Sequence, residues 1–248
     1  MSNGTDAEPV LEVVETGQGV SLQDLGRRGW KRYGVPPGGA LDPHAAQWAN
    51  LLLDNPLDTP VLECLLAGAR FRALREVEVA ITGAAASGET QRWGTTKLGP
   101  DEELALPPPV AGVWTYLAVR GGFRATHWFG SVSVFPRGGL GEPPGPGARL
   151  FAPAETTTRP PRLTSVGARW LDPRERRDYR GPPAIRVWPG PQWDLFAETA
   201  RAAIFDTAWV VSARSDRTGY RLEGFRPRGT FLPRGPVGRT SVGRQPSL

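Results

Sequence analysis

The sequence contains two clusters of acidic and basic residues that could bind or activate a substrate. In each cluster an aspartate lies close to an arginine and to a glycine. Arginine offers a fork of hydrogen-bond donors that fits a carboxylate or carbonyl oxygen, and an ionised aspartate can orient a substrate or accept a proton. The predicted catalytic residues are therefore Asp24, Arg27, Asp216 and Arg217.

Polar neighbours extend both clusters. Their amide, hydroxyl and carboxylate groups can hydrogen-bond a polar substrate. The predicted substrate-binding residues are Gln23, Asp42, Asn50 and Ser215. A structural interpretation stays open beside the functional one, because each aspartate and arginine can also form a buried ion pair that fixes a corner of a β-structure.

Other catalytic chemistries find little support in the sequence. The histidines are His44 and His127, and the one cysteine is Cys64, so no pair has the spacing of a zinc site. There is no G-x-S-x-G motif for a Ser-His-acid nucleophile. Cys64 lies within an apolar run, where we expect a small core residue.

Standard nucleotide-binding motifs are absent from the sequence as well. Neither G-x-x-x-x-G-K-[ST] nor G-x-G-x-x-G occurs. Three glycine pairs remain, and their backbone amides could surround an anion or simply form tight turns. These pairs are Gly38–Gly39, Gly121–Gly122 and Gly138–Gly139.

A helix should follow the first cluster. Asp42 can cap it, and Pro43 at the first helical position costs no hydrogen-bond donor. Pro56 should end it, because the residue before a proline avoids the helical region. One apolar stripe runs along this segment, at Ala45, Ala49, Leu52 and Leu53.

Most of the remaining pattern predicts β-strands. Residues 113–119, VWTYLAV, are nearly all apolar, β-branched or aromatic, which is typical of a strand buried on both faces. Short strands with Gly and Pro between them, and only one further predicted helix at residues 193–205, indicate a mostly antiparallel β protein closed as barrels or a sandwich. Residues 172–183, rich in Arg and Pro, are the predicted linker.

Charge and hydropathy narrow the class of protein. The net charge is +5, but eight arginines and only two acids lie from residue 214 onward, so the rest of the chain is close to neutral. A basic tail of this kind does not predict a nucleic-acid-binding groove. No stretch reaches the roughly 18 apolar residues of a membrane helix. With a single cysteine and no signal-peptide pattern, we expect a soluble cytoplasmic protein.

A family resemblance adds to these observations. The run QDLGRRGWKRYGVPPGGALDPHAAQWANLLLDNP resembles the opening signature of the 5-oxoprolinase C-subunit family, also called the biotin-dependent carboxyltransferase or allophanate hydrolase subunit 2 family. Further blocks that match in the same order are ITGA, YLAVRGG, GSVS, RVWPGPQ and SDRTG. The resemblance covers roughly residues 10–233 and implies cyclophilin-like β-barrel subdomains.

The resemblance also implies an activity. It predicts one subunit of an ATP-dependent 5-oxoprolinase, which hydrolyses a cyclic amide to glutamate with a companion B-type subunit and a lactam-utilisation subunit, the ATP being shared with those partners. One alternative is half of a biotin-dependent, urea-type carboxyltransferase, with biotin carried on another chain. A second is a non-enzymatic, partner-binding regulator in a kinase-inhibitor pair.

The predicted domains follow from the same resemblance. Residues 10–170 should form an N-terminal β-barrel subdomain with the signature helix, and residues 184–233 a partial C-terminal cyclophilin-like subdomain. Residues 234–248 are basic and predicted to be disordered. The family pattern continues beyond residue 233 where this sequence departs from it. We therefore expect a frameshift or truncation there, an incomplete second barrel, and loss of activity as one consequence.

Overall fold

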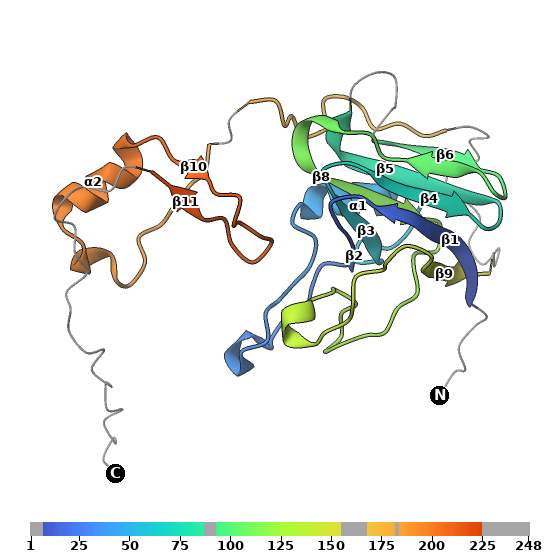
Figure 1. The fold of residues 1–248 in the computed structure, drawn as a ribbon, viewed down its shortest axis with the longest axis horizontal. Helices are drawn as coiled ribbons and strands as arrows, with labels where there is room; N and C mark the ends of the chain where they lie inside the picture. The colour runs from blue at the N-terminus through green and yellow to red at the C-terminus, as the bar shows by residue number, and fades with distance from the viewer. Residues whose placement is uncertain (1–6, 87–92, 155–167, 182–183, 225–248) are drawn as a thin grey trace, which may run out of the picture. The chain divides into compact units, whose positions relative to one another are not determined.

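The computed structural model describes residues 7–86, 93–154, 168–181 and 184–224 (Figure 1). The chain divides into two compact units, residues 1–183 and residues 184–248, and each is described by itself. The predicted basic tail at 234–248 lies outside the described residues. No helix in the described ranges is long and apolar enough to cross a membrane.

The first unit contains two antiparallel sheets. Side chains alternate between the two faces of a strand, so each sheet can turn one apolar face inward. The smaller sheet has the order β7 (Glu103–Ala105), β4 (Ala69–Ala73), β1 (Ala7–Thr16) and β9 (Arg149–Pro153). The larger has the order β2 (Val20–Gln23), β3 (Val61–Leu65), β8 (Pro109–Val119), β5 (Val77–Ala86) and β6 (Gly94–Leu98).

A hydrophobic core joins the two sheets. The smaller sheet contributes Val13 and Phe71, and the larger contributes Leu62 and Leu117, all fully buried. Burying one such side chain stabilises the fold by about 1.5–3 kcal/mol. Cys64 lies in the same core at 1% exposure, which confirms its predicted role as a small buried residue.

Helix α1 (Pro43–Leu52) packs on the other face of the larger sheet. The predicted cap is confirmed, because the backbone N–H of Ala45 donates to Asp42 Oδ1 at 3.2 Å. The predicted apolar stripe is also confirmed, since all four of its residues are buried, at Ala45, Ala49, Leu52 and Leu53. The helix ends at Leu52, four residues before Pro56, and Asp54 then adopts a left-handed φ of 57°.

Strand β8 confirms the prediction for residues 113–119 and begins four residues earlier. It lies between β3 and β5, so both of its edges are paired. Residues 115–119 are buried, with the inter-sheet core on one face and the α1 core on the other. A strand in this position has no polar face, which explains its continuous apolar sequence.

The predicted class, mostly antiparallel β with two α-helices, is confirmed for the described residues. The two sheets of the first unit share one core face to face. No strand pairing among the described residues joins one sheet to the other, so closure into cyclophilin-like barrels stays a prediction.

The stretch predicted as a linker packs against the first unit along part of its length. Leu171, just before this stretch, is buried, and its carbonyl accepts from Arg176 Nε at 2.9 Å. Tyr179 is hydrogen-bonded to the cap residue of α1. Arginine and proline content alone indicated an exposed connection. Tyr179 and Arg176 supply the contacts that this interpretation overlooked.

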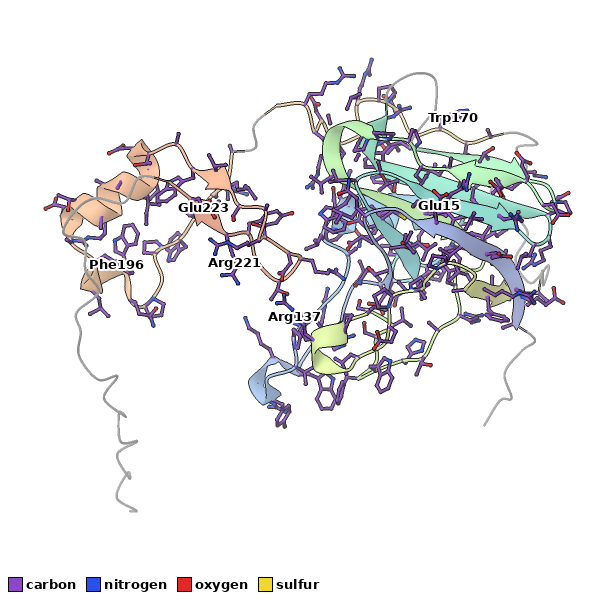
Figure 2. All side chains as sticks on the ribbon, viewed as in Figure 1. Glu15, Arg137, Trp170, Phe196, Arg221 and Glu223 are labelled. Atoms are coloured by element: carbon purple, nitrogen blue, oxygen red, sulfur yellow. The ribbon has the colours of Figure 1, made fainter. Side chains whose placement is uncertain are left out.

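The second unit has little regular structure in residues 184–224. The predicted helix at 193–205 is divided into a 3-10 turn, η3 (Trp193–Leu195), and α2 (Glu198–Asp206), because Phe196 is extended. One two-residue ladder joins β10 (Val210–Val211) to β11 (Leu222–Glu223), the strand where Figure 2 labels Glu223. Of these described residues only Ser212 is buried, and Trp188 is 93% exposed.

Candidate functional site

The carboxylate of Asp24 joins two segments that lie far apart in the sequence. The N–H of Gly26 donates to its Oδ1 at 2.7 Å. The hydroxyls of Ser131 and Ser133 donate to the same oxygen at 2.7 and 2.6 Å. The N–H of Val132 donates to Oδ2 at 2.8 Å. Asp24 therefore holds the turn after β2 against residues 131–133.

The hydrogen bonds determine the charge of Asp24. Burial by itself would raise the pKa of this carboxyl group, but donation from Ser131, Ser133 and two backbone amides outweighs burial and holds the pKa below its ordinary value of 3.8. The group is ionised at neutral pH. A carboxylate with a low pKa and several bound donors is a weak proton acceptor, which favours a structural role in the free protein.

Arg27 reinforces the same junction. Its side chain is 2% exposed. Its guanidinium donates to the carbonyl of Ser133, to that of Trp128 at 3.3 Å and to that of Pro36 at 3.4 Å. A Cβ added at Gly38 would lie 3.1 Å from Arg27 Nη1, so the glycine turn closes directly over the guanidinium.

Gln23, the third member of the first cluster, is fully buried at the end of β2. Its Nε2 donates to Ser21 Oγ at 3.0 Å and to the carbonyl of Val134 at 3.4 Å. Its Oε1 receives no hydrogen bond from the described part of the chain. The structure thus brings Gln23, Asp24 and Arg27 together against residues 128–134.

Asp42 belongs to a different network, at the N-terminus of α1. Its N–H donates to the hydroxyl of Tyr116 at 2.7 Å, and Tyr116 in turn donates to Glu63 Oε2 at 2.9 Å. The hydroxyl of Tyr179 donates to Asp42 Oδ2 at 2.6 Å. Arg177 approaches Asp42 Oδ1 at 3.8 Å.

Both tyrosines stay protonated. Burial and the nearby Glu63 raise the pKa of Tyr116 well above its ordinary value of 10.0. Burial and the hydrogen bond to Asp42 raise the pKa of Tyr179 in the same way.

Sequence reasoning missed Glu63, Tyr116 and Tyr179. The available signal was a glutamate inside the apolar strand VLECL, since a buried carboxylate requires donors.

Tyr179→Phe tests whether residues 168–181 contribute to the stability of the first unit. The change removes one hydrogen bond to a buried carboxylate, so we expect the free energy of unfolding to fall by about 1.5–3 kcal/mol. Denaturant unfolding followed by tryptophan fluorescence measures it. Tyr33→Phe is the matched control, because Tyr33 is 64% exposed and its change should cost almost nothing. Equal stability of the two variants would contradict the expectation.

Asn50 connects α1 to the loop that follows it. Its Nδ2 donates to the carbonyl of Thr59 at 2.8 Å, and its Oδ1 accepts from Asn55 Nδ2 at 3.2 Å. Asn55 Nδ2 also donates to the carbonyl of Val119 at 2.8 Å. These contacts place Asn50 about one helix length from Asp42, where it fixes the end of the helix.

The second predicted cluster lies in the turn between β10 and β11 of the second unit. Asp216 Oδ1 accepts the N–H of Thr218 at 2.8 Å, a local turn that aspartate commonly forms. Ser215 Oγ accepts the N–H of Arg221 at 2.9 Å. Ser215, Asp216 and Arg217 are half-buried. They form a local cluster of their own.

Two of the three glycine pairs use their amides within the protein. Gly121 donates to Asn55 Oδ1 at 2.9 Å, and Gly122 to the carbonyl of Val119 at 3.0 Å. Gly138 and Gly139 donate to carbonyls of their own turn. These amides do not point at a ligand, so the described residues do not fit a complete ATP site at these turns. The described residues likewise contain no group of three His, Cys, Asp or Glu placed to hold a metal.

Comparison with known proteins gives a consistent set of similarities. The family model described as "Carboxyltransferase domain, subdomain A and B" matches residues 33–240. The chain is 30% identical to the C subunit of 5-oxoprolinase from Escherichia coli K12 over 223 residues, which are 87% of this chain and 69% of the relative. It is 30% identical to urea amidolyase of Saccharomyces cerevisiae over 242 residues, but these are only 13% of that protein.

A solved structure shows the same relationship in three dimensions. The crystal structure of TTHA0988 superposes with a TM-score of 0.73 at 30% identity. The match covers 94% of this chain and 45% of the chain in that crystal, and 88% of this chain and 80% of the chain in a second crystal form of TTHA0988. The similarity thus extends through both units, while the larger relatives contain much that this chain does not match.

Proposed function

This chain belongs to the family of carboxyltransferase domains built from subdomains A and B, and on that premise we propose that it is one subunit of an ATP-dependent 5-oxoprolinase. In this proposal it acts with a companion B-type subunit and a lactam-utilisation subunit to hydrolyse the cyclic amide of 5-oxoproline to glutamate. The complex works in the cytoplasm.

One observation carries this choice within the family. The chain matches 69% of a separate 5-oxoprolinase subunit, but only 13% of the multifunctional urea amidolyase at the same identity. A match that covers most of a relative supports proposing the role of that relative for this chain.

The geometry supports different roles for the two clusters. Asp24 and Arg27 bond to the protein itself, so we assign them to positioning the turn at residues 128–133. Gln23 and Asn50 likewise position backbone segments, and Asp42 positions α1. The proposed substrate contacts are Ser215, Asp216 and Arg217. These residues are half-buried, and Ser215 and Asp216 hydrogen-bond within their own turn. There Arg217 would bind the 5-oxoproline carboxylate and Asp216 would orient the amide.

A second candidate is half of a urea-type carboxyltransferase. The 91% of this chain that aligns with urea amidolyase favours it. That reaction needs biotin on a lysine, usually flanked by methionines. The lysines here are Lys31 and Lys97, and neither has such a context. Biotin would therefore be carried on another chain.

Reconstitution separates the candidates. The full chain is mixed with its two purified companion subunits, and phosphate release and glutamate formation are measured with ATP and 5-oxoproline. We expect both products, and neither when this chain is omitted. Carboxyl transfer from carboxybiotin to urea instead would select the second candidate. Stable partner binding with neither activity would indicate the non-enzymatic regulator, and would overturn the proposal.

A further inference from the structure

Exposed aromatic side chains from two separate loops meet on the surface of the first unit. Trp30 and Tyr33 come from the loop that contains η1 (Lys31–Tyr33), and Trp128 and Phe129 from the loop before η2 (Pro136–Gly138). Ring centroids of Trp30 and Phe129 are 4.8 Å apart, and those of Trp30 and Tyr33 are 5.9 Å apart. All four side chains are at least 37% exposed. We call these four residues the aromatic surface.

The backbone at Phe129 is in a left-handed conformation that is strained for a bulky residue. Phe129 has φ 55° and Gly130 has φ 81°, in a tight turn where the N–H of Trp128 bonds the carbonyl of Ser131 at 2.7 Å. A turn with two positive φ values prefers Asn or Gly at its first central position. A bulky residue there costs about 1–2 kcal/mol. Phe129 packs against Trp30 and is nevertheless 45% exposed.

The surroundings of the aromatic surface are positively charged. Residues 25–41 and 121–141, which form the two loops, contain no aspartate or glutamate. Arg28, Lys31 and Arg32 are exposed beside the rings, and the guanidinium of Arg32 lies 4.9 Å from the centre of the Tyr33 ring. Arg137, labelled in Figure 2 on η2, is exposed as well. The next residue after the second loop, Glu142, is an exposed acid, so the field is predominantly positive, and a field of this sign attracts an acidic partner.

The buried junction holds this surface in place. Arg27 donates to the carbonyl of Trp128, and Asp24 accepts from Ser131. Both ends of the strained turn are therefore fixed by fully or nearly buried side chains. A rigid surface of aromatic rings with arginine beside them loses little entropy on binding, which is the composition and order found at the energetic centres of protein interfaces.

We propose that the aromatic surface is the docking site for a protein partner that presents acidic side chains around an apolar contact. The inference rests on the proposed function, which supplies the partner as the companion B-type subunit. A protein fits better than a nucleic acid, because the rings of Trp30 and Phe129 pack on each other and form one continuous apolar area. Nucleic-acid bases need separate ring faces on which to stack.

Phe129→Asn tests the proposal by separating folding from binding. Asparagine suits the left-handed backbone, so the variant should unfold at a higher temperature than the native protein. It also removes the exposed ring, so the affinity for the purified B-type subunit, measured by calorimetry, should fall about 30-fold or more. Phe151→Thr is the control: Phe151 is 41% exposed on β9 and is not part of the aromatic surface, and its contact with the 121–141 loop uses the backbone, where its carbonyl accepts from the N–H of Arg124 at 2.7 Å. The affinity of this variant should not change.

A second variant tests the contribution of the positive charge to binding. Arg28→Gln with Arg32→Gln should slow association and weaken its dependence on salt. If the native chain binds the subunit and Phe129→Asn binds equally well, the docking site is wrong while the proposed function stands. If the native chain neither binds the subunit nor supports hydrolysis, both fall. Binding of a single-stranded oligonucleotide that Phe129→Asn abolishes would overturn the protein partner.

Discussion

Asp24→Asn should lower the free energy of unfolding by about 3 kcal/mol. The native carboxylate accepts from two hydroxyls and two backbone amides. An asparagine keeps one acceptor oxygen, but its NH₂ group must then face a donor that pointed at the other oxygen. The buried N–H of Val132 or the hydroxyls at Ser131 and Ser133 would lose their partner. Denaturant unfolding of the full chain, followed by tryptophan fluorescence, measures the difference.

Two controls define what the Asp24 result means. Asp58→Asn makes the same chemical change at an exposed position, so its stability should stay within about 0.5 kcal/mol of native. Ser133→Ala removes one of the donors and should give an intermediate loss. If Asp24→Asn unfolds no more easily than Asp58→Asn, the carboxylate is not the structural junction that its contacts indicate.

Asp24 should also make the free energy of unfolding depend on pH in the acidic range. The pKa of Asp24 is lower in the folded protein than its ordinary value of 3.8, so the unfolded chain binds the proton first as pH falls. Its contribution is therefore complete above about pH 5, and declines as pH falls below 3.8 towards the folded pKa. Asp24→Asn should flatten this part of the stability curve between pH 5 and the acid transition. An unchanged slope would contradict the shift.

Local chemistry explains what the sequence could predict. The cap at Asp42 and the stripe of α1 depend on residues within one helix length, and the structure has both. The strand at residues 113–119, of which residues 115–119 are buried, could be recognised because a strand with no polar face requires cover on both sides. Cys64 followed from its apolar neighbours alone. In each case the pattern that allowed the prediction lies within a short stretch of the sequence.

The candidate site depends on contacts between distant residues, and these contacts could not be predicted from the sequence. Asp24 and Arg27 were recognised as polar residues with a purpose, but their partners lie about 100 residues away, at Trp128 and residues 131–133. Tyr179 reaches Asp42 across 137 positions. Spacing along one chain cannot pair such residues. The sequence grouped Gln23, Asp24 and Arg27, which the structure also brings together, but could not say whether their polar groups face a ligand or the backbone.

Arg27→Lys is the second change with a large expected effect, about 3 kcal/mol lost from the free energy of unfolding. The guanidinium reaches carbonyls of three separate residues, Pro36, Trp128 and Ser133, from three different nitrogens. A lysine ammonium is a single point and has no equivalent of Nε. It cannot occupy all three directions, so at least one of these hydrogen bonds is lost while the positive charge stays buried.

Arg28→Lys is the matched control for Arg27→Lys. It is the adjacent residue and the same substitution, but Arg28 is exposed, so its stability should be unchanged within about 0.5 kcal/mol. Because Arg27 also fixes the Trp128 carbonyl, Arg27→Lys should loosen the turn that carries Phe129. Faster amide hydrogen exchange at residues 128–133 would show this directly. Equal stability and equal exchange in the two lysine variants would mean that the guanidinium fork does not hold the two loops together.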